Sequence, residues 1–215
     1  MTETQAHGFT WEKDLIQHVY GATDAEMSTI GYTNKIDLPA SLNRLDHVDV
    51  SMKTTGTKHA VCLGDCLRFY DSVSSGKIHM TVIHYLQEDA THTKRLECIT
   101  ELDLTESVKE LFGTLTRPEL EELDTLVKTV PQKRSPTPEE RTNMYSLRDR
   151  LQQRSAAIHL DIKCNSQQSR LQCSFNRFQT FLAEHPARIV ATSKTGAFRG
   201  GQIATSILSK RRTFR

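Results

Sequence analysis

Residues 77–87 read KIHMTVIHYLQ, and this segment constrains the fold more than any other. β-Branched and aromatic residues predominate in it, and apolar side chains occupy both alternating sets of positions, as Ile78, Val82 and Ile83 show. A strand of this kind is buried on both faces in the middle of a sheet. It needs layers of other elements on both sides, which predicts an α/β fold with a central sheet flanked by helices.

Other helix and strand signals surround this segment. Residues 10–21 predict a helix that Thr10 caps and Gly21 ends, with an apolar stripe between them. Strands are expected at residues 31–39, 45–56 and 95–104, and residues 59–73 read as a short strand running into a helix. These elements, with the segment at 77–87, predict a core over residues 1–104.

Residues 105–154 have a different character, because helices with clear start signals replace strands. Thr116 and Thr137 are each followed by a proline within two residues and by a glutamate three residues later, which is the capping-box pattern. We therefore predict a helical insertion over residues 105–154. Residues 155–215 are expected to pack on the core as part of one domain, with a β-hairpin at 158–178, a helix at 178–185, a strand at 187–192 and a last short helix within 197–212.

The composition limits the class of protein. No run approaches the roughly 18 apolar residues that a membrane-spanning helix needs, and the first fifteen residues lack the pattern of a secretory signal. The five cysteines are an odd number without the spacing of a disulfide framework. These features predict reduced thiols and a cytoplasmic location, in the host cell if the protein is viral, and no membrane partner.

The charge is distributed unevenly along the chain. Residues 1–140 contain 14 Lys or Arg and 23 Asp or Glu, whereas residues 141–215 contain 14 Lys or Arg and only 3 Asp or Glu. Nucleic acid is the commonest partner of so basic a segment, because neutralising phosphates releases counterions. Arg199, Lys210, Arg211 and Arg212 are predicted phosphate-binding residues on this basis. The alternative is a solvated basic tail without a partner.

The predicted hairpin at 158–178 carries a group of long polar side chains. Two-stranded ribbons can enter the major groove, where Arg reads guanine and Gln reads adenine. Arg170 and Gln172 are two residues apart, so they share one side of their strand. We predict that Lys163, Arg170, Gln172 and Arg177 bind double-stranded DNA; an exposed hairpin whose polar side meets only water is the alternative.

Residues 47–53, HVDVSMK, present a second polar pattern. Asp49, Ser51 and Lys53 alternate with apolar residues, so one strand directs an acid, a hydroxyl and a lysine to the same side. An ordinary solvated strand face would look the same. The other interpretation is a catalytic face.

The order of elements over about residues 9–90 resembles the PD-(D/E)XK nuclease superfamily, which includes the type II restriction endonucleases. Such proteins often carry a glutamate on the first helix, an aspartate at the end of one strand and an acid-x-lysine pair on the next strand. Glu12 and Asp37 stand at the first two places, and Ser51-Met52-Lys53 follows Asp37 by 14 residues at the third. Ser51 departs from the pattern because the usual residue is an acid, so another element has to supply that carboxylate.

The resemblance implies a restriction-endonuclease-like mixed sheet and a Mg²⁺ cofactor. It implies that Asp37 is the principal metal ligand, that Asp49 and Glu12 are auxiliary ligands, that Ser51 orients a metal-bound water or the lysine, and that Lys53 serves the nucleophile. The physical basis is that Mg²⁺ prefers carboxylate oxygens and lowers the pKa of a bound water.

Together these patterns predict a Mg²⁺-dependent, sequence-specific DNA endonuclease of the type II restriction enzyme kind, acting as a homodimer. A repair or junction nuclease of a phage or large virus fits the same residues. Two other classes stay open: a DNA-binding protein that has kept the nuclease fold without the chemistry, and an interaction or structural protein with a basic tail.

Overall fold

The computed structural model describes residues 10–29, 36–57, 59–164 and 169–208. The protein is of the mixed α/β class, and its main sheet contains both parallel and antiparallel strands, as the sequence predicts. The chain divides into two compact units. Unit 1 comprises residues 1–59, 77–104 and 185–215, and unit 2 comprises residues 60–76 and 105–184.

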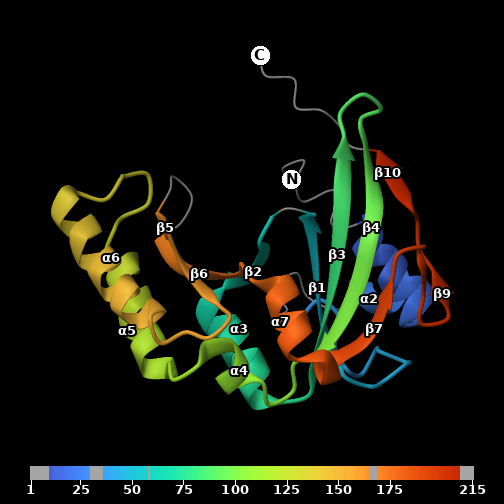
Figure 1. The fold of residues 1–215 in the computed structure, drawn as a ribbon, viewed down its shortest axis with the longest axis horizontal. Coiled ribbons are helices and arrows are strands. Elements are labelled where there is room, and N and C mark those ends of the chain that lie inside the picture. Colours follow the sequence, from blue (N-terminus) through green and yellow to red (C-terminus); the bar gives the residue numbers. More distant parts are fainter. Residues whose placement is uncertain (1–9, 30–35, 58, 165–168, 209–215) are drawn as a thin grey trace. The chain divides into compact units, whose positions relative to one another are not determined.

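The main sheet belongs to unit 1 and is built around the strand that the sequence marks most strongly. The strand β3, Ile78–Glu88, pairs in parallel with β1, Asp49–Gly56, and antiparallel with β4, Thr93–Asp103. β3 and β4 form a long hairpin (Figure 1). β4 also pairs with β7, Ile189–Ser193, and with β10, Ser206–Leu208. β3 is therefore a central strand, which confirms the prediction for this segment.

The first helix of unit 1 covers one face of this sheet. Residues 10–14 are α-helical, and the helix continues as the π-helical turn η1, Leu15–Val19. Its apolar stripe, with Trp11 and Leu15, belongs to one buried cluster with Val50, Met52 and Ile83 of the sheet. The helix ends as expected, at Gly21, whose φ of +79° suits a residue without a side chain. The short helix α2, Asp24–Ser28, follows.

Two segments of unit 1, residues 31–39 and 197–208, differ from the elements that the sequence predicts or are described only in part. Of the strand expected at 31–39, residues 31–35 lie outside the described residues, and Leu38 forms an isolated antiparallel bridge with Val50. The last short helix expected within 197–212 is wrong. The chain forms β8, Ala197–Phe198, and β9, Gly201–Gln202, before β10. The turn at Gly200 has a φ of +87°, and burial of Ile207 beside β4 holds this segment extended.

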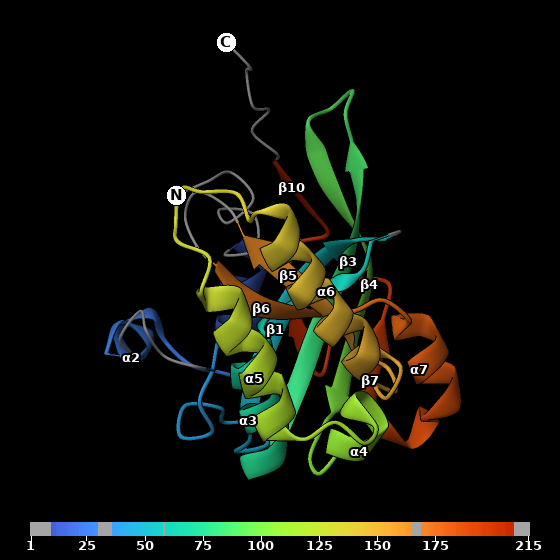
Figure 2. The same ribbon diagram turned by 90° about the vertical axis from the view of Figure 1, so that its left-hand side faces the viewer.

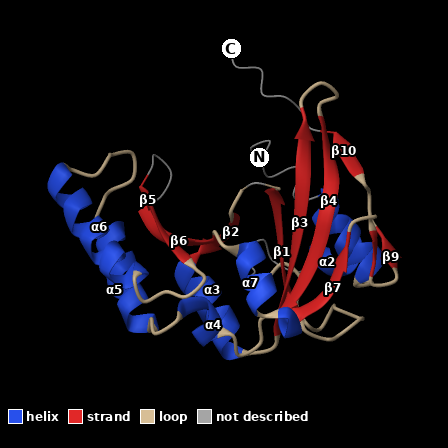
Figure 3. Ribbon diagram, viewed as in Figure 1, coloured by secondary structure: helices blue, strands red, loops and turns tan. Residues whose placement is uncertain are grey.

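Unit 2 contains a three-stranded sheet with helices on one side. The strand order is β2, Val61–Asp65, then β6, Ser169–Phe175, then β5, His159–Cys164. β5 and β6 are the predicted hairpin. Figure 2 shows α5, Arg117–Lys128, and α6, Pro138–Gln152, side by side next to this sheet. The other helices, coloured in Figure 3, are α3, Cys66–Ser75, α4, Val108–Phe112, and α7, Phe178–Glu184.

Both predicted helix starts in residues 105–154 are confirmed. The backbone N–H of Thr137 donates to Glu140 Oε2 at 2.7 Å, and the Glu140 N–H donates to Thr137 Oγ1 at 3.2 Å. The backbone N–H of Thr116 donates to Glu119 Oε2 at 2.9 Å. Each bond satisfies a backbone or side-chain group that the first helical turn leaves open.

The division of the chain differs from the three consecutive segments that we expected, 1–104, 105–154 and 155–215. Residues 60–76 belong to unit 2, because β2 pairs with β6 and α3 packs beside them. Residues 185–215 belong to unit 1, because β7 and β10 pair with β4. None of the helices in the described part of the chain combines the length and the apolar character that a membrane-spanning segment needs.

Candidate functional site

Three of the residues predicted for catalysis meet at the edge of β1 in unit 1. Asp37 Oδ2 accepts from the backbone N–H of Met52 at 2.6 Å, from Ser51 Oγ at 3.2 Å and from Lys53 Nζ at 3.2 Å. The bridge between Leu38 and Val50 holds the Asp37 segment against β1. The structure therefore brings Asp37, Ser51 and Lys53 together, although 14 residues separate the first two in sequence.

The charges of this group are partly shielded from solvent. The Lys53 side chain is 21 % exposed and that of Asp37 is 32 % exposed. Lys53 Nζ also donates to the Met52 carbonyl at 3.0 Å. The hydroxyl of Ser51 donates to Asp37 and so helps to hold the aspartate in place. Among the described residues, Asp37 Oδ1 has no hydrogen-bond partner, and it is the oxygen left for a ligand.

Glu12 completes this group from the first helix. The pKa of Glu12 is raised to about 7, mainly by burial and also by the nearby charge of Asp37, and Lys53 partly offsets these two effects. These electrostatic effects place Glu12 in the neighbourhood of the other two charged groups. Glu12 also lines a small open pocket of about 160 Å³, together with Ile16 and Met27. The prediction that Glu12 belongs with Asp37 is consistent with this arrangement.

Asp49, predicted as an auxiliary metal ligand, has a different contact. Its Oδ1 accepts from the backbone N–H of Ala40 at 2.7 Å, in the turn that follows Pro39. Asp49 is the first residue of β1, and this hydrogen bond fixes the turn beside the strand. Its carboxylate thus has a structural partner outside the group of Glu12, Asp37, Ser51 and Lys53, which we call the Asp37 cluster.

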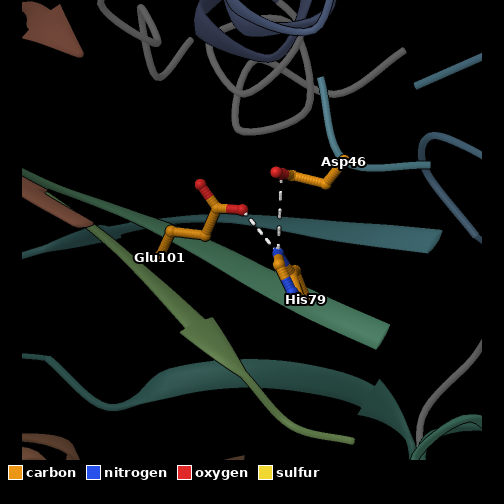
Figure 4. Close-up of side chains that lie close together, drawn as sticks. All are labelled: Asp46, His79 and Glu101. Carbon is orange, nitrogen blue, oxygen red and sulfur yellow. Dashed lines mark hydrogen bonds and ion pairs between the residues drawn. The ribbon is translucent and has the colours of Figure 1, made fainter. Parts of the chain in front are cut away.

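A second charged group in unit 1 was not predicted. Figure 4 shows His79 of β3 between the carboxylates of Asp46 and Glu101 of β4. His79 Nδ1 lies 2.7 Å from Glu101 Oε1 and 4.0 Å from Asp46 Oδ2. Glu101 is fully buried, and its Oε2 has no hydrogen-bond partner among the described residues. The sequence signal is weak, consisting of polar residues at positions 79, 81 and 101 in strands that are otherwise apolar.

Arg199 supplies the positive charge for this second group. Its guanidinium bonds both oxygens of Asp46, at 2.5 and 2.8 Å, and Glu101 Oε1 at 2.8 Å. The Arg199 side chain is only 16 % exposed. Binding of DNA by Arg199 stays a prediction, and its Nη1 and Nη2 already donate to two carboxylates of its own unit. The remaining predicted phosphate-binding residues, Lys210, Arg211 and Arg212, lie outside the described residues.

In the described part of the chain, one group of three possible metal ligands lies close together. Asp46, His79 and Glu101 place their ligand atoms within 4.8 Å of one another, and the guanidinium of Arg199 is bonded to both carboxylates and offsets one of their two negative charges. The Asp37 cluster offers the free oxygen of Asp37 and the carboxylate of Glu12. These are hard oxygen donors, and Mg²⁺ commonly takes only one or two carboxylates and keeps its waters. Mg²⁺ at the Asp37 cluster stays a prediction.

The residues predicted for DNA binding in unit 2 lie on β5 and β6 or just after them. Lys163 and Arg170 are direct cross-strand partners, and both are partly exposed. Arg177 is exposed and lines an open pocket of about 370 Å³ with His159 and Asn176. Gln172 is only 8 % exposed. With its amide oxygen turned toward Arg170, Gln172 accepts from Arg170 Nη2 at 2.5 Å and from Arg170 Nε at 3.1 Å.

The chain matches no protein-family model, no curated protein and no solved structure.

Proposed function

We propose that the protein is a Mg²⁺-dependent endonuclease that hydrolyses phosphodiester bonds of double-stranded DNA at the Asp37 cluster. The observation that carries this proposal is the convergence of Asp37, Ser51 and Lys53, with Glu12 nearby. The order of elements supports it as well. A helix with Glu12, a bridge beside Asp37, the strand β1 with Ser51 and Lys53, the helix α3 and the central strand β3 occur in the order that the resemblance to PD-(D/E)XK nucleases implies, with α2 after the first helix and β2 before α3 as additional elements.

Each residue of the cluster has a role that follows from its contacts. Asp37 Oδ1 and the Glu12 carboxylate would hold Mg²⁺, which when bound supplies an activated water and neutralises the scissile phosphate. Ser51 Oγ and the Met52 N–H keep Asp37 in one orientation. Lys53 would offset the negative charge that develops on the phosphate, because an ammonium held in place is worth most where the charge appears.

The missing acid of the acid-x-lysine pair has a candidate replacement in Glu12. Glu12 interacts electrostatically with both Asp37 and Lys53, whereas Asp49 is bonded to the Ala40 backbone. We therefore assign the compensating carboxylate to Glu12. In the absence of metal the raised pKa keeps much of Glu12 protonated near neutral pH, and a bound cation would favour its charged form.

The test is incubation of supercoiled and linear DNA with the purified protein in Mg²⁺ or in EDTA. We expect Mg²⁺-dependent fragments, and a loss of at least about 100-fold in rate for Asp37→Ala and for Lys53→Ala. Two exposed residues of the same unit provide matched controls, Asp89→Ala for the aspartate and Lys77→Ala for the lysine, and both should cleave at the wild-type rate.

The outcome of this experiment separates the classes of function that the sequence left open. Intact DNA in both Mg²⁺ and Mn²⁺, with retained DNA binding, would refute hydrolysis and leave a non-catalytic DNA-binding protein. Cleavage that persists in Asp37→Ala and Lys53→Ala would refute the assignment of the site. A protein that neither cleaves nor binds DNA would fit an interaction or structural protein.

A further inference from the structure

The group of Asp46, His79 and Glu101 lies in unit 1, and the dashed lines in Figure 4 join His79 to both carboxylates. Thr81 follows His79 by two residues on β3, and Glu101 is directly opposite Thr81 on β4. These three side chains therefore share one face of the main sheet. The hydroxyl of Tyr20, at the end of the first helix, lies 2.7 Å from Thr81 Oγ1. The charged group thus lies on the face that the first helix covers.

This group has an excess of negative charge. Glu101 is fully buried and the Asp46 side chain is 23 % exposed, while the Arg199 guanidinium donates to both carboxylates. One guanidinium offsets one of the two negative charges, so one remains when the imidazole of His79 is neutral. Burying an unpaired charge is costly. Glu101 Oε2 also has no hydrogen-bond partner among the described residues, so the buried carboxylate keeps an acceptor for a further cation.

The three ligand atoms are of the kinds that bind transition metals. An imidazole nitrogen together with carboxylate oxygens suits Zn²⁺ or Fe²⁺, whereas Mg²⁺ prefers oxygen ligands alone. Ligand atoms about 2 Å from a tetrahedral ion lie about 3.3 Å from each other. His79 Nδ1 lies 2.7 Å from Glu101 Oε1 and 4.0 Å from Asp46 Oδ2, on either side of that value. Small side-chain rotations therefore suffice to form three positions of a metal site.

Arg199 Nη1 lies where a cation would bind the two carboxylates. It is 2.5 Å from Asp46 Oδ2 and 2.8 Å from Glu101 Oε1. A metal ion on these oxygens has to displace Nη1. Arg199 Nη2 donates separately to Asp46 Oδ1 at 2.8 Å, and this bond is compatible with an ion on Oδ2. The arginine and a metal ion thus compete for the same two oxygens, so removal of the arginine should favour the ion.

We propose that Asp46, His79 and Glu101 form a binding site for a divalent transition-metal ion of the Zn²⁺ type. The ion joins the turn that contains Asp46 to the strands β3 and β4. Its role is structural, because Glu101 is fully buried and the His79 side chain is only 11 % exposed. The site shares no residue with the Asp37 cluster and takes a different class of cation, so it does not depend on the proposed function.

The first experiment is calorimetric titration of the purified protein with Zn²⁺, in excess Mg²⁺ so that sites made only of oxygen ligands are filled. We expect one tightly bound ion per chain. His79→Gln and Asp46→Asn should weaken its binding by about 100-fold or more, because loss of even an outer partner of a metal ligand costs about 10- to 100-fold. His92→Gln and Asp89→Asn, at exposed positions between β3 and β4, are the matched controls and should bind Zn²⁺ like the wild type.

The cysteines need a separate control, because thiolates also bind Zn²⁺. All five are free thiols. Titration with Co²⁺ distinguishes the ligands, because a thiolate ligand gives an intense charge-transfer absorption that nitrogen and oxygen ligands lack. We expect this absorption to be absent when one Co²⁺ ion is bound to the wild type.

Arg199→Met gives a readout that adventitious binding would not. The variant lacks the competing cation, so it should bind Zn²⁺ about tenfold more tightly than the wild type, or tighter still. An ion that binds the folded state stabilises it according to its affinity. Zn²⁺ should therefore raise the stability of Arg199→Met more than that of the wild type. Urea unfolding in EDTA and in Zn²⁺ measures this difference and verifies that each variant is folded.

The proposal is overturned if the wild type binds no Zn²⁺, or if His79→Gln and Asp46→Asn bind it as tightly as the wild type. It is also overturned if the Co²⁺ complex shows thiolate absorption, or if Arg199→Met binds Zn²⁺ no more tightly. The protonated imidazole of His79 would then supply the second positive charge of the group. DNA cleavage is measured in Mg²⁺ without Zn²⁺, so failure of the metal titrations and failure of the proposed function are distinguishable.

Discussion

Replacing Glu12 with glutamine should stabilise the protein at alkaline pH, because Glu12 is a carboxylate that the fold places in an unfavourable environment. Its pKa is raised from 4.5 to about 7, mainly by burial. A carboxyl group whose pKa is raised on folding binds its proton more tightly in the folded state. The free energy of unfolding therefore falls as the pH rises from about 4.5 to about 7, and it stays lower above that range.

The size of this effect follows from the same values. One pKa unit corresponds to about 1.4 kcal/mol, so a rise from 4.5 to about 7 costs about 3 kcal/mol once Glu12 is fully ionised. Because Glu12 is partly exposed, solvent screening reduces this to about 2–3 kcal/mol. Glu12→Gln removes the ionisation, so at pH 8 it should be more stable than the wild type by that amount, and at pH 5 by less than about 1 kcal/mol.

The assay is urea unfolding at pH 5 and pH 8 in metal-free buffer with EDTA. Glu26→Gln is the matched control, because hydrogen bonds from Thr23 lower the pKa of this partly exposed glutamate. Its stabilising contribution is present above its ordinary pKa and is lost as the pH falls, so Glu26→Gln should destabilise the protein more at pH 8 than at pH 5. A Glu12→Gln variant that is no more stable than the wild type at pH 8 would refute the reasoning about burial.

Adding Mg²⁺ extends this prediction to the proposed ligand. A cation that binds the folded state stabilises it according to its concentration and affinity. We expect Mg²⁺ to raise the stability of the wild type at pH 8 and to raise that of Glu12→Gln much less. Equal responses of the two proteins would argue against Glu12 as a metal ligand.

Three further predictions concern the framework of the two units. Arg199→Met leaves Asp46 without its bidentate partner, so urea unfolding should show a loss of about 3–5 kcal/mol. Gly113→Ala places a methyl group 2.2 Å from the backbone oxygen of Arg154 at a φ of +64°, so it should lower the free energy of unfolding by about 3 kcal/mol or more. Gly76→Ala is its control: the methyl group meets nothing within 4 Å, so the free energy of unfolding should stay the same or rise by up to about 1 kcal/mol. Thr137→Ala removes a helix cap and should lower the thermal midpoint by an amount equivalent to about 0.5–2 kcal/mol.

The elements that the sequence predicted well have local causes. The central strand at residues 78–88 follows from its uninterrupted apolar and β-branched residues, and the helix starts at Thr116 and Thr137 follow from capping boxes whose partners are three residues apart. The C-terminal segment was predicted wrongly because its conformation depends on a distant partner. Ile207 pairs with Lys94 of β4, and no sequence pattern within residues 197–208 predicts that contact.

The two charged groups of unit 1 show the same distinction. The Asp37 cluster could be anticipated because Ser51 and Lys53 alternate on one strand and Asp37 precedes them at a familiar distance. The group of Asp46, His79, Glu101 and Arg199 could not. Its members are spread over more than 150 residues and meet only because β3, β4 and the turn at β8 and β9 come together. The same contacts concern Arg199. The sequence shows only a basic residue in a segment without acids, whereas in the structure its guanidinium is paired with Asp46 and Glu101.

The interleaving of the two units has a consequence for how the protein is made. Unit 2 is complete once residue 184 has been synthesised, whereas the sheet of unit 1 lacks β7 and β10 until residues 189–208 follow. During synthesis the edge of β4 that later pairs with β7 and β10 therefore has unpaired backbone groups. Such an edge can pair with another chain before folding is complete. Nonsense truncation after unit 2 would leave this exposed edge permanently, so a shortened chain should aggregate even though every proposed catalytic residue is present.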